Sequence, residues 1–275
     1  MPAANSYEPD KTGGRRVALV TGAYGMIGKA IARQIAAQPS FEVVLAGRRE
    51  AMLQQAAQDI RQVTGSPFVR VEVVDVAQKA SIDALAKRWQ GPLHVLVNNA
   101  ASSPRKRQET SQGFEVQFAT NVLGYFWMIQ AFQDVLKRSA PARVVNVASY
   151  WAGDLDLEDL EFKHRQYNNH SAYRQSKQAD RMLTVAFAER LQPFGIVVNA
   201  CHPGDVNSKL SNDLGFGGHE SPDDGADTPV WLAISPDGDR ETGGYFADRQ
   251  PVRCRFGEDR QAVEALYDVC QRYSG

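Results

Sequence analysis

The chain has 275 residues, of which 43% are hydrophobic, and its 31 basic and 32 acidic side chains give a formal net charge of −1. This balance argues against a nucleic-acid-binding protein, because neutralising phosphates requires an excess of basic side chains. The sequence lacks three further patterns: an apolar run of the ~18 residues that span a membrane, the apolar segment of a signal peptide, and cysteines grouped for disulfides or metal. We therefore expect a globular cytoplasmic protein with no membrane anchor and no metal site.

Short runs rich in valine and leucine alternate along the chain with longer stretches of helical periodicity. Runs that are apolar on both faces are typical of buried parallel strands. We predict such strands at 17–20, 41–46, 69–74, 94–98, 143–148 and 195–200. We predict helices at 27–38, 50–63, 80–90, 113–138 and 171–192. This alternation indicates a single-domain, Rossmann-like α/β fold, in which a doubly wound parallel sheet has helices on both faces.

The first predicted strand runs directly into the glycine-rich segment TGAYGMIG and then into a helix. Gly22, Gly25 and Gly28 allow a tight turn and let the backbone approach a pyrophosphate group closely. The free N–H groups and positive dipole at the start of the helix attract the same group. A plain strand-to-helix turn remains an alternative, but the position at the first strand of a parallel sheet favours a dinucleotide site.

The second predicted strand ends in LAGRRE, about 20 residues further along. A site for NAD usually has an acidic residue there, which binds the ribose 2′-hydroxyl. Here Gly47 takes that place, and Arg48 and Arg49 follow. Because a guanidinium can bind a 2′-phosphate with two hydrogen bonds, this segment favours NADP(H) over NAD(H). The alternative is that both arginines are solvated residues at the start of a helix.

Tyr173 and Lys177 stand four positions apart in YRQSK, and on a helix they share a face. A phenol titrates near ~10, but a neighbouring ammonium stabilises the phenolate and lowers this pKa. Ser149 and the pair Asn98 and Asn99 follow central strands, at the edge where α/β sheets build their sites. Together these residues predict acid–base chemistry at the carboxyl end of the sheet.

From about residue 15 to residue 250, the sequence resembles the short-chain dehydrogenase/reductase family. VTGAYGMIG is similar to the family's glycine motif, VVDVA to its adenine-contacting segment, NNAA to its Asn-Asn-Ala-Gly turn, and CHPGDVNSKL to its Pro-Gly-x-Val-x-Thr segment. Asn121, Ser149, Tyr173 and Lys177 match its catalytic tetrad. The resemblance, with the arginines above, implies a cofactor site made of Gly22, Tyr24, Gly25, Met26, Ile27, Gly28, Arg48, Arg49, Asp75, Val76, Asn99, Ala100, Tyr173, Lys177, Pro203, Gly204, Val206 and Ser208.

Within that family, the chain looks like the retinol-dehydrogenase-like group, partly because Tyr173 follows Ser149 only after 24 positions. Two residues depart from the usual pattern. Met26 stands where the shorter branch of the family has a glycine, and the resulting glycine spacing is commoner in the extended branch, which includes epimerases and dehydratases. Ala101 replaces the glycine that usually follows Asn-Asn-Ala.

The resemblance implies an NADP-dependent oxidoreductase that interconverts an alcohol and a carbonyl on a small, rather apolar molecule. Ser149 and Tyr173 would bind the substrate oxygen, Tyr173 would transfer the proton, Lys177 would hold the nicotinamide ribose, and Asn121 would anchor a water that relays protons. Two alternatives stay open: an epimerase or dehydratase that recycles its cofactor, and a non-catalytic dinucleotide sensor. The family commonly pairs through helices equivalent to 113–138 and 171–192, which implies a homodimer or homotetramer.

The chain divides, on this interpretation, into a polar tail at 1–14, a dinucleotide-binding catalytic domain at 15–250 and a C-terminal tail with a short helix at 251–275. The Gly/Pro/Asp-rich stretch 211–229 is too long for an ordinary connection. We expect a mobile lid at 208–225, which contains Gly215, Gly217 and Gly218, and a helix that starts near Pro222. The basic cluster at 105–107 and the histidines of 154–170 are interpreted as solvated surface, although the former could attract an acidic substrate.

Overall fold

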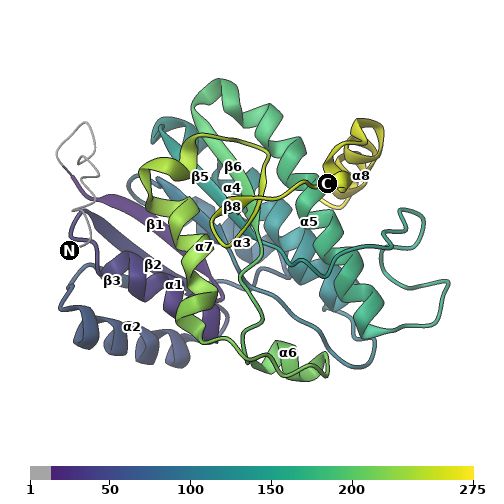
Figure 1. The fold of residues 1–275 in the computed structure, drawn as a ribbon, viewed down its shortest axis with the longest axis horizontal. Helices are drawn as coiled ribbons and strands as arrows, with labels where there is room; N and C mark the ends of the chain where they lie inside the picture. The colour runs from purple at the N-terminus through teal and green to yellow at the C-terminus, as the bar shows by residue number, and fades with distance from the viewer. Residues whose placement is uncertain (1–13) are drawn as a thin grey trace.

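The computed structural model describes residues 14–275, so all of the tail predicted at 1–14 except its last residue lies outside the described residues (Figure 1). The strands are β1 (Arg16–Thr21), β2 (Phe41–Gly47), β3 (Val69–Val73), β4 (Val95–Asn98), β5 (Ala142–Val147), β6 (Ile196–Cys201), β7 (Tyr245–Ala247) and β8 (Gln250–Pro251). The α-helices are α1 (Met26–Ala36), α2 (Glu50–Thr64), α3 (Lys79–Arg88), α4 (Gly124–Arg138), α5 (Asn169–Leu191), α6 (Lys209–Asp213), α7 (Pro222–Ile234) and α8 (Arg260–Arg272). Helical turns of other types are η1 (Phe118–Leu123), η2 (Gln192–Phe194), η3 (Pro236–Asp239) and η4 (Arg255–Gly257).

The strands form one sheet in the order β3-β2-β1-β4-β5-β6-β7-β8, and every pair is parallel except β7 with β8. The chain builds outward from β1 to β3, then returns to the other side of β1 with β4. A crevice therefore opens where the carboxyl ends of β1 and β4 diverge, which is where open α/β sheets bind their ligands.

Helices cover both faces of the sheet, as the sequence predicted (Figure 1). Alternate residues of β1 point into two separate apolar clusters: Val17 and Leu19 pack with the helices α3, α4, α5 and α8, whereas Ala18 and Val20 pack with α1, α2 and α7. Both faces of the central strands are therefore dry, which is why these strands consist almost wholly of apolar residues. The predicted Rossmann-like fold is confirmed.

Several predicted elements differ from the structure. The stretch 69–74 is not a strand buried on both faces: β3 ends at Val73, is half-buried and closes one edge of the sheet. The helix predicted over 113–138 begins with the π-helical turn η1 before continuing as α4. β7 and β8 were not predicted, because segments of three and two residues carry no periodicity.

The stretch 211–229 is not one long irregular connection, and the helix start predicted near Pro222 is confirmed. α6 ends at Asp213 and α7 begins at Pro222. A capping box starts α7: the hydroxyl of Ser221 accepts a hydrogen bond from the backbone of Asp224, whose carboxylate accepts one from the backbone of Ser221. Only residues 214–221 remain irregular between the two helices.

The C-terminal helix α8 packs across α4 and α5 (Figure 1). Val263, Leu266 and Cys270 on its inner side are fully buried. Its end is tied to α4, because the indole Nε1 of Trp127 donates to the hydroxyl of Ser274 over 3.1 Å. α8 is thus part of the hydrophobic core. In residues 14–275, none of the helices is long and apolar enough to cross a membrane.

Candidate active site

The turn from β1 into α1 is shaped to receive a phosphate group. Gly22 has φ of +65°, and a Cβ atom on Gly28 would lie 2.6 Å from Nδ2 of Asn99 and overlap the carbonyl of Gly22. Both positions therefore require glycine. Thr21 Oγ1 accepts hydrogen bonds from the backbone N–H groups of Asn99 at 2.9 Å and Ala100 at 3.1 Å, and this holds the ends of β1 and β4 together. No side chain caps the first N–H groups of α1, so they are available to an anion.

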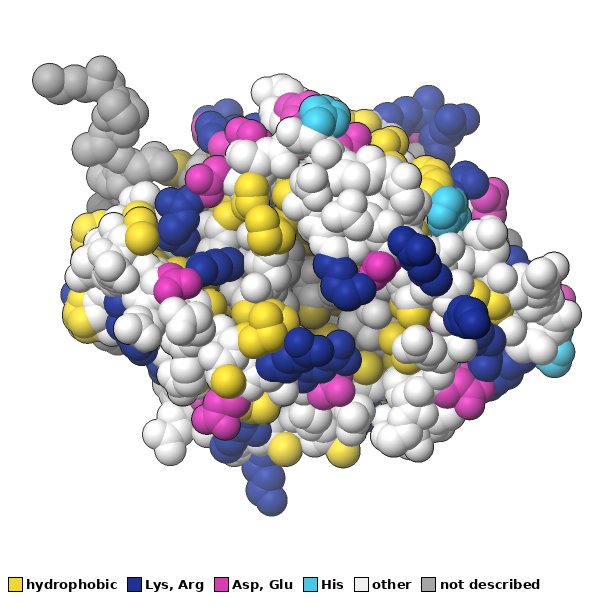
Figure 2. Space-filling view, turned by 90° about the horizontal axis from the view of Figure 1, so that it is seen from below, with side chains coloured by type: hydrophobic (Ala, Val, Ile, Leu, Met, Phe, Trp, Pro, Cys, Tyr) yellow, Lys and Arg dark blue, Asp and Glu magenta, His cyan; other side chains and the backbone are white. Residues whose placement is uncertain are grey.

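A cavity of about 730 Å³ lies along this edge of the sheet. Figure 2 shows the molecule from this side, with lysine and arginine side chains around a hollow near the middle of the face. The predicted cofactor residues that line the cavity are Gly22, Tyr24, Gly25, Met26, Ile27, Gly28, Arg48, Arg49, Asp75, Val76, Asn99, Ala100 and Ser208. Beyond the glycine-rich cradle at 22–28, the cavity is also lined by 101–105 and 209–210. Of these, the sequence analysis had singled out only Ala101 and Arg105, and Arg105 of the basic cluster therefore faces the cavity.

The segment after β2 presents positive charge to one end of this cavity. Arg48 and Arg49 are exposed, and neither pairs with an acidic side chain among the residues described. Nη1 of Arg49 donates only to the sulfur of Met52, over 3.6 Å. At Gly47, a Cβ atom would lie 2.7 Å from Cε1 of Tyr24, so the ring of Tyr24 occupies the space beside the position where an acidic side chain would stand.

Asp75 and Val76 follow β3 at the same end of the cavity. The carboxylate of Asp75 accepts hydrogen bonds from the backbone of Ala77 at 3.1 Å and from the side chain of Gln78 at 3.3 Å. These bonds hold the Asp75 side chain in the turn that leads to α3.

Asn121 lies in the π-helical turn η1 and is fully buried. Its Oδ1 accepts from the backbone N–H of Ser102 at 2.8 Å, while its Nδ2 donates to the carbonyl of Ser102 at 3.1 Å and to the hydroxyl of Ser176 at 3.0 Å. The side chain thus bridges the segment after β4 to α5. A π-turn inside an α-helix frequently marks a functional position, and here it coincides with this bridge.

Tyr173 and Lys177 lie on α5, and Ser149 lies just beyond β5. The helix is started by Asn168, whose side chain accepts from the backbone N–H groups of His170 and Ser171. All three predicted catalytic side chains are buried, with exposures of 7% for Tyr173, 1% for Lys177 and 6% for Ser149. The structure therefore brings them together, although none of them lines the 730 Å³ cavity.

The environment of Tyr173 contains groups that raise the pKa of its hydroxyl and groups that lower it. Burial raises the pKa of Tyr173 above its ordinary value, while the charge of Lys177 and the hydrogen bond with Ser149 act to lower it. In the ligand-free chain, burial is the strongest of these influences. The predicted effect of Lys177 is present, since its charge acts to lower this pKa, but burial of the phenol outweighs it, and the lysine is itself paired with an acid.

That acid is Asp180, which the sequence analysis missed. The Nζ of Lys177 donates to Oδ2 of Asp180 at 2.8 Å and to the carbonyl of Val147 at 3.0 Å. An aspartate three positions after a lysine resembles an ordinary pair on a solvated helix face. Only the packing of α5 between the sheet and α8 makes this pair a buried one.

Aromatic side chains gather beside Tyr173, and the sequence analysis had not singled them out for the site. The ring of Trp151 lies 6.2 Å from that of Tyr173, 5.7 Å from Phe216 and 5.3 Å from His170, measured between centroids. Phe216, from the stretch between α6 and α7, is 47% exposed. These rings make an aromatic wall beside the ring of Tyr173, with Trp151 at its centre.

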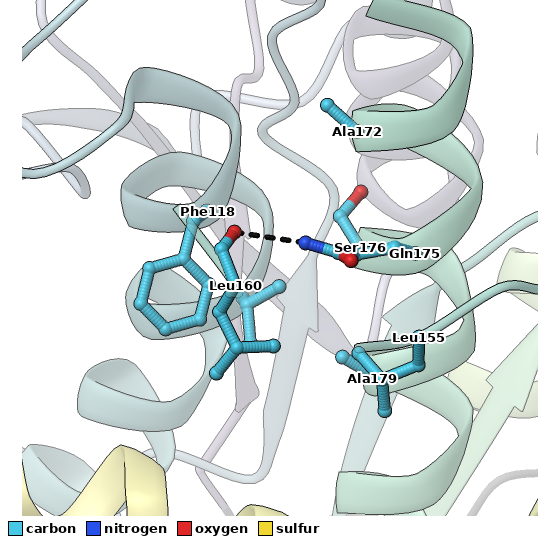
Figure 3. A pocket seen from close by; sticks show the side chains of 8 residues that line it. Phe118, Leu155, Leu160, Ala172, Gln175, Ser176 and Ala179 are labelled. Carbon is cyan, nitrogen blue, oxygen red and sulfur yellow. Dashed lines mark hydrogen bonds between the residues drawn. The ribbon is translucent and has the colours of Figure 1, made fainter. Parts of the chain in front are cut away.

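The stretch 154–168, which separates β5 from α5, is held against α5 rather than looped into solvent. Gln175 Nε2 donates to the carbonyl of Leu160 at 2.8 Å, as drawn in Figure 3. The small gap between Leu160, Phe118 and Ala179 in that view has no room for a water molecule. The insertion therefore packs tightly against α5 and η1, and no ligand fits behind it.

The segment after β6 forms a loop that is closed at its base. The backbone N–H of Asp205 donates to Oε2 of Glu220 at 2.8 Å, and Val206 forms an isolated β-bridge with Glu220. Gly204, with φ of +85°, makes room for the Glu220 carboxylate. Ser208 caps α6 by accepting from the backbone of Ser211 at 3.1 Å. Of the predicted residues here, Ser208 lines the cavity, whereas Pro203, Gly204 and Val206 do not.

The fold, the glycine-rich cradle and the buried group of Asn121, Ser149, Tyr173 and Lys177 are typical of an enzyme that uses a dinucleotide. Comparisons with known proteins agree with this class. The family model for short chain dehydrogenases matches residues 16–215. Retinol dehydrogenase 13 from Mus musculus is 34% identical, over 94% of this chain and 84% of that protein. The chain therefore belongs to the short-chain dehydrogenase/reductase family, whose members bind NAD(P), and its likeness to the retinol-dehydrogenase-like group is confirmed.

Solved structures agree with this assignment. A crystal structure of an uncharacterized protein from Mycobacterium paratuberculosis has a TM-score of 0.81 and 28% identity, and the match covers 97% of this chain and 95% of that one. The RhlG/NADP active-site complex of Pseudomonas aeruginosa has a TM-score of 0.68 and 25% identity over 85% of this chain and 94% of that one. The enzyme class expected from the sequence is thereby confirmed.

Proposed function

We propose that this enzyme interconverts an alcohol and a carbonyl group with NADP(H), and that Tyr173 transfers the proton. The observation that carries the proposal is the burial of Tyr173, Ser149 and Lys177 in one group behind the cradle at β1 and β4. A buried phenol beside an ammonium and a hydroxyl is arranged for proton transfer, which has little use in a protein that only senses nucleotides.

The residues of the cradle fit a dinucleotide. Gly22 and Gly28 leave room for a pyrophosphate against the N-terminus of α1, and Lys177 keeps one N–H donor after bonding Val147 and Asp180. We assign that donor to the nicotinamide ribose. The bound cofactor supplies or accepts the hydride, and all remaining steps fall to the protein.

In this mechanism, Ser149 and Tyr173 hold the substrate oxygen by hydrogen bonds. For reduction, the hydroxyl of Tyr173 gives its proton to that oxygen, and for oxidation the phenolate removes the proton. Oxidation should therefore rise with pH until Tyr173 is ionised, because only the phenolate accepts a proton. The Asn121 side chain, fixed by Ser102 and Ser176, would position the water that carries protons to and from Lys177.

The preference for NADP(H) rests on charge at the β2 end of the cavity. Arg48 and Arg49 are exposed there, lack acidic partners among residues 14–275 and stand beside Gly47, where no carboxylate is present to bind a 2′-hydroxyl. A 2′-phosphate would complete the hydrogen bonding of these guanidinium groups. NAD(H) offers them nothing comparable.

The substrate expected from the wall around Tyr173 is a small molecule with a rather apolar skeleton. Trp151 packs beside the tyrosine and Phe216 packs beside Trp151, so these partly exposed rings offer apolar surface to a substrate. The test is a screen of aldehydes and ketones for oxidation of NADPH, run in parallel with NADH. Turnover of an apolar carbonyl with NADPH supports the proposal, whereas turnover in the screen that Tyr173→Phe leaves intact contradicts it.

The association state and the cytoplasmic location remain predictions. We propose a homodimer or homotetramer on the family resemblance, although α8 lies over the α4 and α5 face on which pairing was expected. Pairing there requires α8 to join the interface or to move. Sedimentation of the full chain and of a variant with Ala265→Glu, on the exposed side of α8, distinguishes pairing that involves α8 from pairing on another surface.

A further inference from the structure

The buried ion pair between Lys177 and Asp180 is unusual in its surroundings. The side chain of Lys177 is 1% exposed and that of Asp180 is 0% exposed, and one carboxylate oxygen receives the ammonium at 2.8 Å. The second oxygen, Oδ1 of Asp180, is buried and has no hydrogen-bond partner among the residues described. A carboxylate that is buried and half-satisfied is costly to the fold, so stability does not account for an acid at this position.

The pair determines what Lys177 can do. An ammonium has three N–H donors, and Asp180 and the carbonyl of Val147 take two of them. Both acceptors belong to elements that are rigidly packed, because Asp180 lies on α5 and Val147 ends β5. The direction of the third N–H is thereby set before any ligand binds. Nζ of Lys177 lies 5.8 Å from the ring centre of Tyr173.

Charged and titratable groups face this pair from every neighbouring element. Tyr173 and Arg181 lie on α5 itself, Tyr125 lies on α4, Cys201 on β6 and Cys270 on α8. The buried hydroxyl and thiol groups are neutral at ordinary pH, because burial raises the pKa of Tyr125 and of both cysteines.

Asp180 is therefore the acid in contact with Lys177. Arg181 is directed elsewhere, since its guanidinium donates to the carbonyl of Ser149 and stacks on Tyr245. Asp205, beyond β6, also acts on Tyr173 and raises its pKa, so it must stay unchanged in any test.

We propose that Asp180 is a positioning residue, which holds the ammonium of Lys177 beside Val147 and balances its charge, and so limits how strongly that charge acts on Tyr173. This inference rests on the proposed function, in which Tyr173 exchanges the proton. It adds that the tyrosine is governed by a buried pair rather than by a lone lysine. Asp180 does not line the cavity and its carboxylate contacts Lys177, so its effect is transmitted through Lys177.

The experiment compares Asp180→Asn with the wild-type enzyme. Asparagine keeps the shape of the side chain and an oxygen for Lys177 but removes the negative charge. The charge of Lys177 then acts on Tyr173 without compensation, so the phenolate is favoured. We expect the pH at which alcohol oxidation reaches half its plateau to fall by about one unit, a tenfold change in the ionisation equilibrium.

The titration of Tyr173 is measured independently of turnover. In protein labelled at the ζ-carbon of tyrosine, the resonance assigned by its loss in Tyr173→Phe should titrate at lower pH in Asp180→Asn than in the wild type, by a similar amount. This readout stands even if Tyr173→Phe retains turnover and the proposed function fails. The failure of the proposal and the failure of the function are therefore distinguishable.

Matched variants complete the test. Asp134→Asn removes the same charge from the exposed far end of α4 and should leave both titrations in place. Asp180→Glu keeps the charge and should keep the wild-type profile, and Asp180→Ser replaces Asp180→Asn if the latter does not fold. The proposal is overturned if Asp180→Asn titrates as the wild type or at higher pH, if Asp180→Glu shifts as far as Asp180→Asn, or if neither neutral variant folds.

Discussion

The enzyme places positive charge at two ends of its active site in opposite environments. After β2, Arg48 and Arg49 are exposed and have no acidic partner in residues 14–275. On α5, Lys177 is buried and receives an acid and a carbonyl from the protein itself. The first arrangement leaves whole guanidinium groups for a ligand to satisfy, whereas in the second the protein itself takes two of the three ammonium donors and leaves one.

The difference matches the two tasks of the site. An exposed guanidinium keeps its hydration until a phosphate replaces the water, so it can select between ligands at little cost to the fold. A buried ammonium is only weakly screened by solvent, so its field acts on a neighbouring phenol far more strongly than the same charge would in water. In the proposed function, selection of the cofactor and control of the proton are thus assigned to separate parts of the site.

The largest expected effect is at the buried end. Tyr173→Phe removes the proton carrier and keeps the ring, so turnover should fall by about 10²–10⁴-fold, the usual contribution of a general acid or base. Affinity for NADPH, measured by fluorescence titration, should change little. Tyr245→Phe is the matched control, because this buried hydroxyl on β7 lacks a hydrogen-bond partner among the described residues. Equal losses in the two variants would contradict the role of Tyr173.

At the exposed end, Arg48→Ala should weaken NADPH while leaving NADH almost unchanged. One charge-assisted hydrogen bond contributes about 1.5–3 kcal/mol, which corresponds to roughly 10- to 150-fold in dissociation constant. The measurement is the dissociation constant of each cofactor for the wild type, Arg48→Ala and Arg49→Ala. If either variant weakened NADPH and NADH alike, the arginine concerned would have no role in selecting the 2′-phosphate.

Ionic strength should separate the two ends without any substitution. The Debye length falls from about 10 Å at 0.1 M salt to about 3 Å at 1 M, so NADPH affinity should drop several-fold over that range. The drop should be smaller in Arg48→Ala. The pH dependence of turnover should stay in place, because the Lys177–Asp180 pair is dry. A pH profile that moved with salt would show that solvent reaches the buried pair.

The smallest effect is expected at the far end of α5. Arg190 makes two hydrogen bonds with Glu264 of α8, at 3.0 and 2.5 Å, but the side chains are 34% and 45% exposed. Glu264→Gln should lower the free energy of unfolding by only about 0.2–1 kcal/mol, as for other solvated pairs. Urea unfolding measures this change. A loss of several kcal/mol would show that the exposure of an ion pair does not predict its contribution to the free energy of unfolding.

The sheet could be predicted from the sequence because its central strands are buried on both faces. Runs such as VALV and RVVNV do not alternate between apolar and polar residues. This pattern is typical of strands in a parallel sheet that has helices on both faces. β3 misled the prediction because an edge strand in the same sheet keeps a similar composition while half exposed. The prediction also missed β7, whose three residues are held by pairing with β6 rather than by any pattern of their own.

The candidate site divides in the same way. The glycines of the cradle and the tyrosine–lysine spacing are local patterns, so they could be found in the sequence. Asp180 could not, since its meaning comes from burial under elements distant along the chain. The aromatic wall was missed for the same reason, because Trp151 and Phe216 are 65 positions apart and meet only in the folded chain.

The closed base of the loop after β6 has a consequence for protein engineering. Because Asp205 and Val206 are joined to Glu220, the two ends of the loop stay together whatever lies between them. Loops of this kind tolerate exchange of their contents, since the entropy of closing them changes slowly with length. Residues 214–219, which follow α6 and its cavity-lining residues, could therefore be replaced as a cassette, with Gly204 and Glu220 kept, to present a new surface opposite Trp151 and accept molecules of another shape.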